Sequence, residues 1–206
     1  MNKCRFFLLL VFAFPGLSLA DEASALKVLA SADSSVQDKA MACDELGRVG
    51  GAAAVPVLVN LLADEKLQDY ARDGLERIND PAVGKALLGA LTSLKGHSRV
   101  GVIITLGDRR EKAAVDALAK IAKEKDDRHA VEAALSSLAQ IASDEAGAAL
   151  LAALTGGEVS KSAAARSALA AADRMDAEGR KAAADKLRKA VAGADVPGYI
   201  KKVAGE

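Results

Sequence analysis

The chain has 206 residues, of which 51% are hydrophobic and only 3% aromatic, and its 28 basic side chains balance its 28 acidic ones. This balance offers no excess of positive charge for nucleic acid, so nucleic-acid binding is not expected. The absence of tryptophan argues against an interface anchored on aromatic hot spots.

The first 20 residues have the pattern of a secretory signal peptide. Lys3 and Arg5 form a basic start, residues 6–14 form an apolar stretch, and Ala20 ends a small-x-small cleavage site. An uncleaved membrane anchor is the alternative, but Pro15 interrupts the apolar run well short of the roughly 20 residues that a spanning helix needs. We therefore expect cleavage after Ala20, a periplasmic or secreted protein, and no membrane span in the mature chain.

Removal of this signal leaves a chain with few aromatic residues and one cysteine. All four phenylalanines lie in the signal, so Tyr70 and Tyr199 are the remaining aromatic residues. Loss of the two basic residues leaves 26 basic against 28 acidic side chains, a net charge of −2. Cys43 has no partner for an intrachain disulfide and is expected to be a small buried residue. A reactive thiol or an intermolecular bridge is the alternative for this cysteine.

Apolar residues of the mature chain recur at three- and four-residue steps, which is typical of one-sided helices. Residues 21–35 are expected to carry a short capping helix at 23–32, because the first unit of a helical stack has no neighbour on its outer face. The first full unit spans residues 36–62. One of its helices ends at Val49, and the other holds Pro56 in its first turn, where a missing amide hydrogen costs little.

Three similar units follow at residues 67–94, 98–123 and 127–154. The turns between their two helices are placed at Asp80-Pro81, Gly107-Asp108 and Ser143-Asp144. Aspartate or serine at such a turn caps the helix that follows. The second helices open at corresponding alanines with successive offsets of 28, 32 and 32 residues, namely Ala54, Ala82, Ala114 and Ala146. A repeat of about 30 residues predicts a stacked helical solenoid.

The last part of the chain, residues 156–193, is richer in alanine, lysine and arginine and fits a weaker repeat or a cap. Helices are expected at 158–172 and 177–192, with Asp176 capping the second helix and Gly193 ending it. Pro197 then introduces a short lysine-rich tail within residues 194–206.

The units share a core phrase, which reads Leu46-Gly47-Arg48-Val49, Leu75-Glu76-Arg77-Ile78 and Leu138-Ala139-Gln140-Ile141. With their capping turns and Leu-x-x-Leu-Leu second helices, residues 36–155 resemble HEAT repeats, in particular the short bacterial kind related to phycobilisome-lyase repeats. The resemblance implies an all-α fold, a right-handed superhelical α-solenoid of about five helix pairs whose second helices line a concave face. It implies no particular activity, because a fold does not determine function.

Two groups of residues are candidates for binding a partner. The resemblance places Asn60, Lys85, Asp116 and Lys120 on the concave side of the second helices, where we expect a broad polar interface without a deep pocket. Arg48, Arg77 and Arg109 follow the repeat and form a ladder that suits an anionic partner at the edge of the stack. The alternative for this ladder is structural, because cations near a helix C-terminus complement the helix dipole.

No set of catalytic residues is recognisable in the sequence. His97 and His129 lie near the starts of neighbouring first helices, but they differ in register and no cysteine supports them as metal ligands. Acidic pairs such as Asp64-Glu65 fall at helix boundaries, where they cap or hydrate turns. We therefore expect no catalytic residue, no metal and no cofactor.

These observations favour a non-enzymatic, exported scaffold that binds a protein partner. The alternative, which comes from the resemblance, is an accessory protein of the bilin-lyase or haem-oxidoreductase kind.

Overall fold

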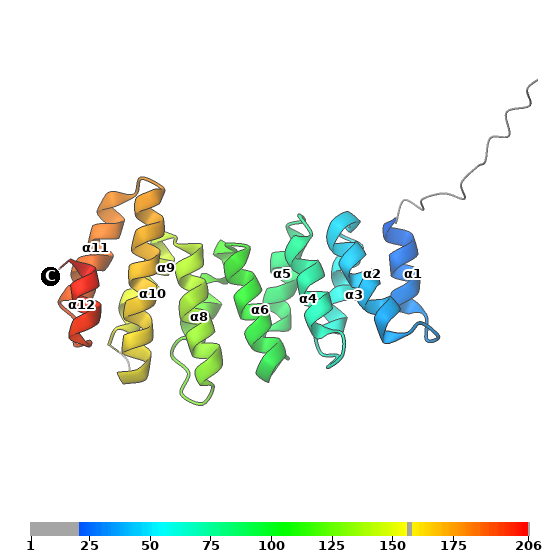
Figure 1. The fold of residues 1–206 in the computed structure, drawn as a ribbon, viewed down its shortest axis with the longest axis horizontal. Helices are drawn as coiled ribbons and strands as arrows, with labels where there is room; N and C mark the ends of the chain where they lie inside the picture. Colours follow the sequence, from blue (N-terminus) through cyan, green and yellow to red (C-terminus); the bar gives the residue numbers. More distant parts are fainter. Residues whose placement is uncertain (1–20, 156–157, 206) are drawn as a thin grey trace, which may run out of the picture.

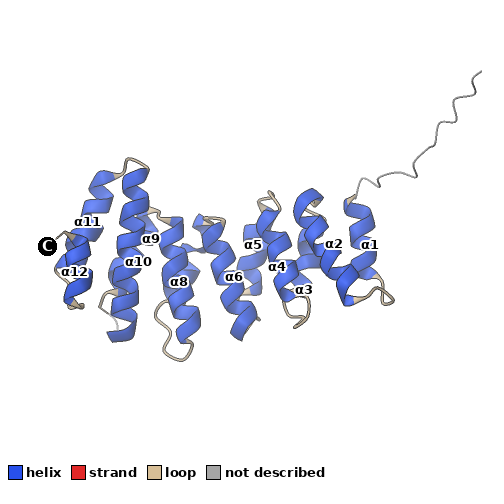
Figure 2. Cartoon of the chain, viewed as in Figure 1, coloured by secondary structure: helices blue, strands red, loops and turns tan. Residues whose placement is uncertain are grey.

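The computed structural model describes residues 21–155 and 158–205, and every regular element in these residues is helical (Figure 2). The predicted all-α fold is confirmed for this part of the chain, whereas the predicted signal peptide lies outside the described residues. In chain order the helices are α1 (Glu22–Ala30), α2 (Val36–Val49), α3 (Ala54–Leu61), α4 (Gln68–Arg77), α5 (Ala82–Ala90), α6 (Gly96–Asp108), the 3₁₀ turn η1 (Lys112–Ala114), α7 (Val115–Ile121), α8 (Arg128–Ile141), α9 (Asp144–Ala153), α10 (Glu158–Ala177), α11 (Lys181–Ala192) and α12 (Gly198–Ala204).

The helices form two rows that run along the long axis of the molecule (Figure 1). In the first row, α2 packs on α4, α4 on α6, α6 on α8, and α8 on α10. In the second row, α3 packs on α5, and α7 packs on α9. Helix α1 covers one end by packing on α2 and α3, and α12 covers the other end by packing on α10 and α11.

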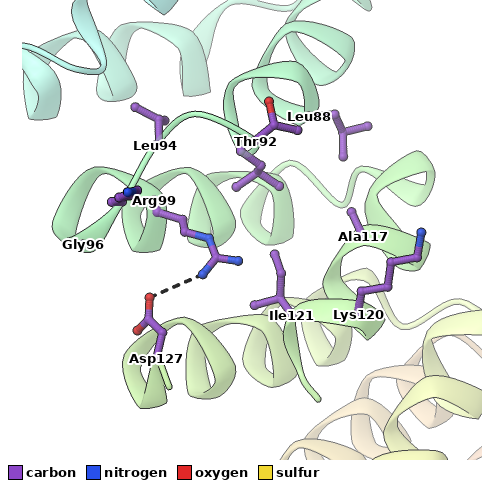
Figure 3. A pocket seen from close by; sticks show the side chains of 11 residues that line it. Leu88, Thr92, Leu94, Gly96, Arg99, Ala117, Lys120, Ile121 and Asp127 are labelled. Carbon is purple, nitrogen blue, oxygen red and sulfur yellow. Dashed lines mark hydrogen bonds and ion pairs between the residues drawn. The ribbon is translucent and has the colours of Figure 1, made fainter. Parts of the chain in front are cut away.

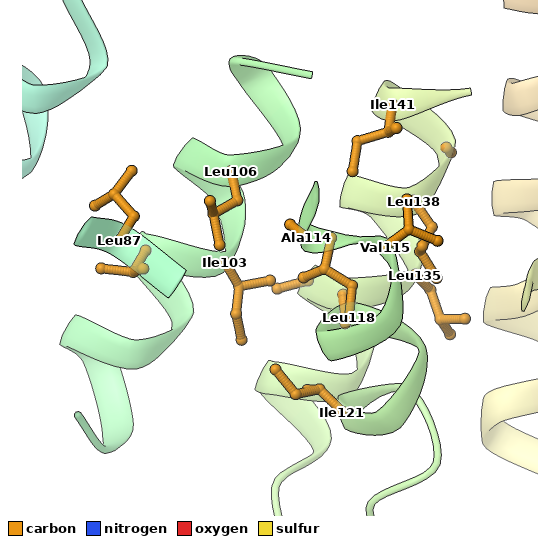
Figure 4. Close-up of a cluster of buried hydrophobic side chains, with 14 of the residues drawn as sticks. Leu87, Ile103, Leu106, Ala114, Val115, Leu118, Ile121, Leu135, Leu138 and Ile141 are labelled. Atoms are coloured by element: carbon orange, nitrogen blue, oxygen red, sulfur yellow. The ribbon is translucent and has the colours of Figure 1, made fainter. Parts of the chain in front are cut away.

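Between the rows lies a continuous aliphatic core. The leucines of the repeated phrase, Leu46, Leu75 and Leu138, are fully buried there, and Figure 4 shows the central part of this core between α5 and α8. Fully burying a leucine contributes about 1.5–3 kcal/mol each time. The periodicity that predicts one-sided helices therefore identifies the residues that hold neighbouring pairs together.

Glycine and other small residues bring the first-row helices close to one another. A Cβ atom at Gly74 would lie 2.8 Å from the carbonyl oxygen of Cys43, and one at Gly107 would lie 2.7 Å from the Cα of Ser137. The Ser137 hydroxyl also donates to the Ile103 carbonyl at 2.8 Å, so α6 and α8 meet with their backbones nearly in contact. The predicted turn at Gly107-Asp108 is wrong, because α6 continues to Asp108 and uses Gly107 for this close approach.

The second-row helices share one burial pattern. Residues 54–60, 83–89, 114–120 and 146–152 each read buried, buried, exposed, half-buried, buried, half-buried, exposed. The prediction that Ala82 corresponds to Ala54, Ala114 and Ala146 is therefore wrong by one residue. Ala82 is exposed, and the burial pattern of α5 begins at Val83. Gly84 takes the second buried position of α5, where a Cβ atom would lie 2.0 Å from a carboxylate oxygen of Glu111.

Two of the predicted capping turns are confirmed in detail. The Asp80 carboxylate accepts the Ala82 N–H at 2.7 Å, and the Ser143 hydroxyl oxygen accepts the Ala146 N–H at 3.1 Å. Both contacts satisfy amide groups that the start of a helix leaves without an internal partner.

The C-terminal part differs from the prediction. Helix α10 continues to Ala177, so Asp176 caps no helix and instead accepts Arg188 Nη1 at 3.2 Å. The chain turns at Gly179, whose φ of +79° suits glycine, and α11 ends at Gly193. Part of the predicted tail forms α12, which is anchored by the buried Ile200. Over the described ranges, no helix has both the length and the apolar character needed to cross a membrane.

Candidate functional site

The four predicted second-helix residues lie at the exposed positions of the shared burial pattern. Lys85 and Asp116 occupy its third position, and Asn60 and Lys120 occupy its seventh. Small residues fill the remaining exposed positions of the four helices. We call the resulting set the second-row surface: Pro56, Asn60, Lys85, Gly89, Asp116, Lys120, Ala148 and Ala152.

A depression of about 420 Å³ between α3 and α5 brings Asn60 and Lys85 together. Its remaining lining is apolar and includes Pro56, Val59 and Ala86. The structure therefore joins two of the four predicted residues in one shallow hollow, while Asp116 lines neither this depression nor the next.

A second cavity, of about 580 Å³, lies between α5 and α7 and includes Lys120 (Figure 3). Leu88, Leu91 and Ile121 contribute apolar side chains to it. Its polar side includes Arg99, which the sequence did not single out. The guanidinium of Arg99 binds both carboxylate oxygens of Glu124, at 2.7 and 2.8 Å, and Asp127 at 3.4 Å.

The three arginines of the predicted ladder are engaged within the chain. Arg48 pairs with Glu45 and, at 3.7 Å, with Asp44 on its own helix. Arg77 reaches across from α4 to α2 and binds the Asp44 carboxylate at 2.8 Å. Arg109 does more, because one of its terminal nitrogens donates to three carbonyl oxygens near the end of α4, those of Leu75 at 3.1 Å and of Glu76 and Ile78 at 2.7 Å.

These contacts fit the alternative interpretation of the ladder, in which the arginines stabilise the fold. Arg109 closes the C-terminal end of α4 from the following unit, where carbonyl groups lack internal partners and attract a cation. Binding of an external anion by Arg48, Arg77 and Arg109 stays a prediction, and it has to compete with these intrachain partners.

Further charged clusters join units that are distant in sequence. The carboxylate of Glu178 accepts Arg110 at 2.5 Å and Arg180 at 2.8 Å, and these hydrogen bonds, chiefly that from Arg110, lower the pKa of Glu178. Likewise, the hydrogen bond from Arg99 to Glu124 is the main cause of a raised pKa for Arg99. Sequence inspection missed Arg99 and Arg110 because their partners, Glu124 and Glu178, lie 25 and 68 positions away.

Cys43 lies fully buried on α2, as predicted for a small core residue. Burial raises the pKa of its thiol to about 11, so the thiol stays protonated near neutral pH. A protonated, inaccessible thiol is a poor nucleophile.

The two histidines lie at the exposed start of α6 and α8. His97 Nε2 is 3.1 Å from the Asp69 carboxylate, with 70% of the histidine side chain exposed, and His129 is also exposed. Among the residues that the structure describes, no group of three or more His, Cys, Asp or Glu side chains is placed to hold a metal ion.

The two rows thus use their charged side chains differently. Arg77 and Arg109 are bound to carboxylate and carbonyl groups of a neighbouring first-row helix, whereas Lys85, Asp116 and Lys120 form no ion pair with another described residue. The charged groups of the second-row surface are therefore available to another molecule. No protein-family model matches this chain, and no match is found among curated proteins.

Proposed function

We propose that this chain is an exported, non-enzymatic α-solenoid of the HEAT type that binds a protein partner through its second-row surface. The observation that carries the proposal is the burial pattern shared by α3, α5, α7 and α9. Because the pattern repeats, it presents the same two exposed positions from each of four helices. A repeated surface of this kind suits an extended partner.

The packing of the rows supports the solenoid part of the proposal. First-row neighbours follow the chain order from α2 to α10, so each pair is held mainly by the pairs before and after it. In repeat proteins such nearest-neighbour contacts supply stability and leave one long face free for recognition.

The chemistry of the second-row surface supports a protein partner. Half of its residues are proline, glycine or alanine, and its charges are few and of both signs. A nucleic-acid surface would need a continuous basic stripe, which Lys85, Asp116 and Lys120 do not make. A protein interface is typically of mixed polarity over about 800 Å² on each partner, which several adjacent helices can supply.

Export is proposed from the sequence, since the signal lies outside the described residues. The single mature cysteine is compatible with an oxidising compartment, because its thiol is buried and protonated. Mass spectrometry of the exported protein is expected to give an N-terminus at Asp21. An intact N-terminus at Met1 would contradict cleavage.

Capturing a partner protein from the exported fraction with the wild type and with two matched variants tests the proposed function. The exposed residues Ala148 and Ala152 of α9 are changed together to Arg, and in the control variant the exposed first-row residues Ser136 and Ala170 are changed to Arg. We expect a protein captured by the wild type to be retained by the control and lost from the α9 variant. Equal capture by both variants, or no captured protein at all, would contradict the proposal.

Mixing the purified protein with bilin or haem tests the alternative reading. A scaffold without a cofactor leaves the visible spectra of these pigments unchanged. A shifted absorption band would favour the accessory-protein reading instead.

A further inference from the structure

The second row is interrupted between α5 and α7. Helix α3 packs along α5 and α7 packs along α9, but α5 meets the third unit through the short turn η1. The 580 Å³ cavity lies at this interruption, bounded by α5, the start of α6, and α7 (Figure 3). Its volume falls in the range of about 300–1,000 Å³ that is usual for ligand sites.

The floor of this cavity is aliphatic. Leu91, Leu94 and Ile121 are buried beneath it, and Leu88 and Ala117 are half-buried at its sides. The lining contains no aromatic side chain, so the floor offers dispersion contacts and burial of apolar area without a stacking platform. A branched aliphatic side chain is the group that fits such a floor best.

The acidic groups near the cavity are already bound. Both oxygens of Glu124 accept hydrogen bonds from Arg99. One oxygen of Asp127 accepts Arg99, and the other accepts the Ala130 N–H at 3.0 Å, which caps α8. Arg99 itself is only 17% exposed and is held as a cation by these contacts. Every carboxylate oxygen of this cluster therefore already accepts a hydrogen bond, and the single guanidinium balances one of the two negative charges.

The cationic groups at the rim are not bound in this way. Lys95 and Lys120 both line the cavity, both are exposed, and neither forms an ion pair with another described residue. The Arg99 cluster carries one positive and two negative charges, so with Lys95 and Lys120 these five side chains have a net charge of +1 beside the aliphatic floor. A complementary occupant carries an aliphatic group next to negative charge.

We propose that this cavity holds a segment of the partner protein in which a leucine-like side chain is flanked by carboxylate side chains. The inference rests on the proposed function, because Lys120 belongs both to the cavity rim and to the second-row surface. An extended partner lying on that surface would thus pass directly over the opening. The aliphatic side chain enters the cavity, and the flanking carboxylates face Lys95 and Lys120.

Binding of short synthetic peptides to the exported protein tests this proposal. A fluorescent acetyl-Gly-Glu-Leu-Leu-Glu-Gly peptide is titrated by fluorescence polarisation, beside one version with Gln for Glu and one with Ser for Leu. We expect measurable binding of the first peptide and at least about tenfold weaker binding of the other two, since a tenfold change corresponds to 1.4 kcal/mol. Equal binding of all three, or no binding of the first, would overturn the proposal.

Two variants locate the binding to the cavity. The double change Lys95→Gln and Lys120→Gln removes the rim charges, and Ala117→Leu fills the cavity without a change of charge. Both are expected to weaken the first peptide about tenfold while the circular dichroism spectrum is unchanged. The control, Lys181→Gln with Lys186→Gln on the exposed side of α11, has the same change in net charge and is expected to bind as the wild type does. If the control variant weakens binding equally, the effect comes from overall charge, and the proposed site is wrong.

The outcome separates this inference from the proposed function. If the peptides fail to bind while the α9 variant still loses the captured protein, the second-row surface stands and the cavity proposal fails. If decanoate displaces the peptide completely and binds more tightly than it, the cavity takes a small amphiphile, and the peptide proposal is overturned.

Discussion

First-row and second-row helices of this protein differ in length, in contacts and in what they leave exposed. The first-row helices α2, α4, α6, α8 and α10 have 14, 10, 13, 14 and 20 residues, whereas the second-row helices α3, α5, α7 and α9 have 8, 9, 7 and 10. First-row helices meet through glycine contacts and arginine side chains that cross between units. Second-row helices bury one side in the core and present small residues and a few polar ones on the other.

Under the proposed function, this difference would separate stability from recognition. A change at Gly74, Gly107 or Arg109 in the first row disturbs a backbone contact or removes a ligand of helix-end carbonyl groups. A change at an exposed second-row position leaves the folded contacts intact. We therefore expect substitutions to affect stability in the first row and binding in the second.

The largest effect is expected for Gly107→Ala. The added Cβ would lie 2.7 Å from the Ser137 Cα, so α6 and α8 must move apart, which costs about 3 kcal/mol of the free energy of unfolding. The second-row control is Gly89→Ala, whose Cβ meets no atom within 4 Å and which is expected to stabilise its helix by about 0.5–1 kcal/mol. Urea denaturation of both variants measures the difference in their stability. Equal denaturation midpoints would contradict the distinction between the rows.

A smaller loss is expected for Arg109→Met. The variant keeps much of the apolar stem but leaves three carbonyl groups at the end of α4 without their cationic donor, which costs about 2 kcal/mol. Lys85→Met on the second-row surface removes the same charge and is expected to shift stability by less than about 0.5 kcal/mol. Thermal melting followed by circular dichroism compares the two, and a neutral Arg109→Met would show that this arginine does not close α4.

The turn between α10 and α11 gives a more modest test. Gly179 has φ of +79°, and a Cβ atom there meets no neighbour within 4 Å, so Gly179→Ala is strained only by its left-handed backbone and costs about 1 kcal/mol. Gly198→Ala also meets open space, but its φ is not positive, and it is expected to cost less. Chemical denaturation of the two variants separates the effect of the backbone conformation from that of packing. Identical losses of stability would show that the positive φ of Gly179 does not matter.

The smallest effect concerns pH. Hydrogen bonds from Arg110 and Arg180 lower the pKa of Glu178 below its ordinary 4.5 in the folded chain. The resulting stabilisation is present above pH 4.5 and is lost as the pH falls through the lower folded pKa, since the unfolded chain takes up this proton first. Glu178→Gln should flatten the fall of the melting temperature in that acidic range, and an unchanged pH profile would show that this carboxylate does not stabilise the fold.

The helical pattern could be predicted from the sequence because it follows from local chemistry. Leucine spacing identified the core residues, and Asp80 and Ser143 identified two helix starts, since a cap acts within three residues. The expectation that Asn60 and Lys85 are exposed came from the resemblance, and both residues are exposed. Cys43 was placed in the core because its neighbours on that helix are apolar.

The errors arose where a local signal has two meanings. Glycine ends helices and also permits close packing, and only the opposing Ser137 shows which applies at Gly107. Asp176 resembles a cap, but the alanine-rich helix before it has no reason to stop until Gly179 supplies a positive φ. The contacts of Arg109 and the cavity beside Arg99 depend on segments from different units, so no single stretch of sequence reveals them.

Site-specific photo-crosslinking in the exporting cell tests the division between the rows most directly. A photoreactive residue is introduced at exposed second-row position 85 or 116, or at exposed first-row position 104 or 136. We predict a common protein adduct from positions 85 and 116 and none from positions 104 and 136. An adduct formed from the first-row positions alone, or equally from both rows, would contradict the assignment of recognition to the second-row surface.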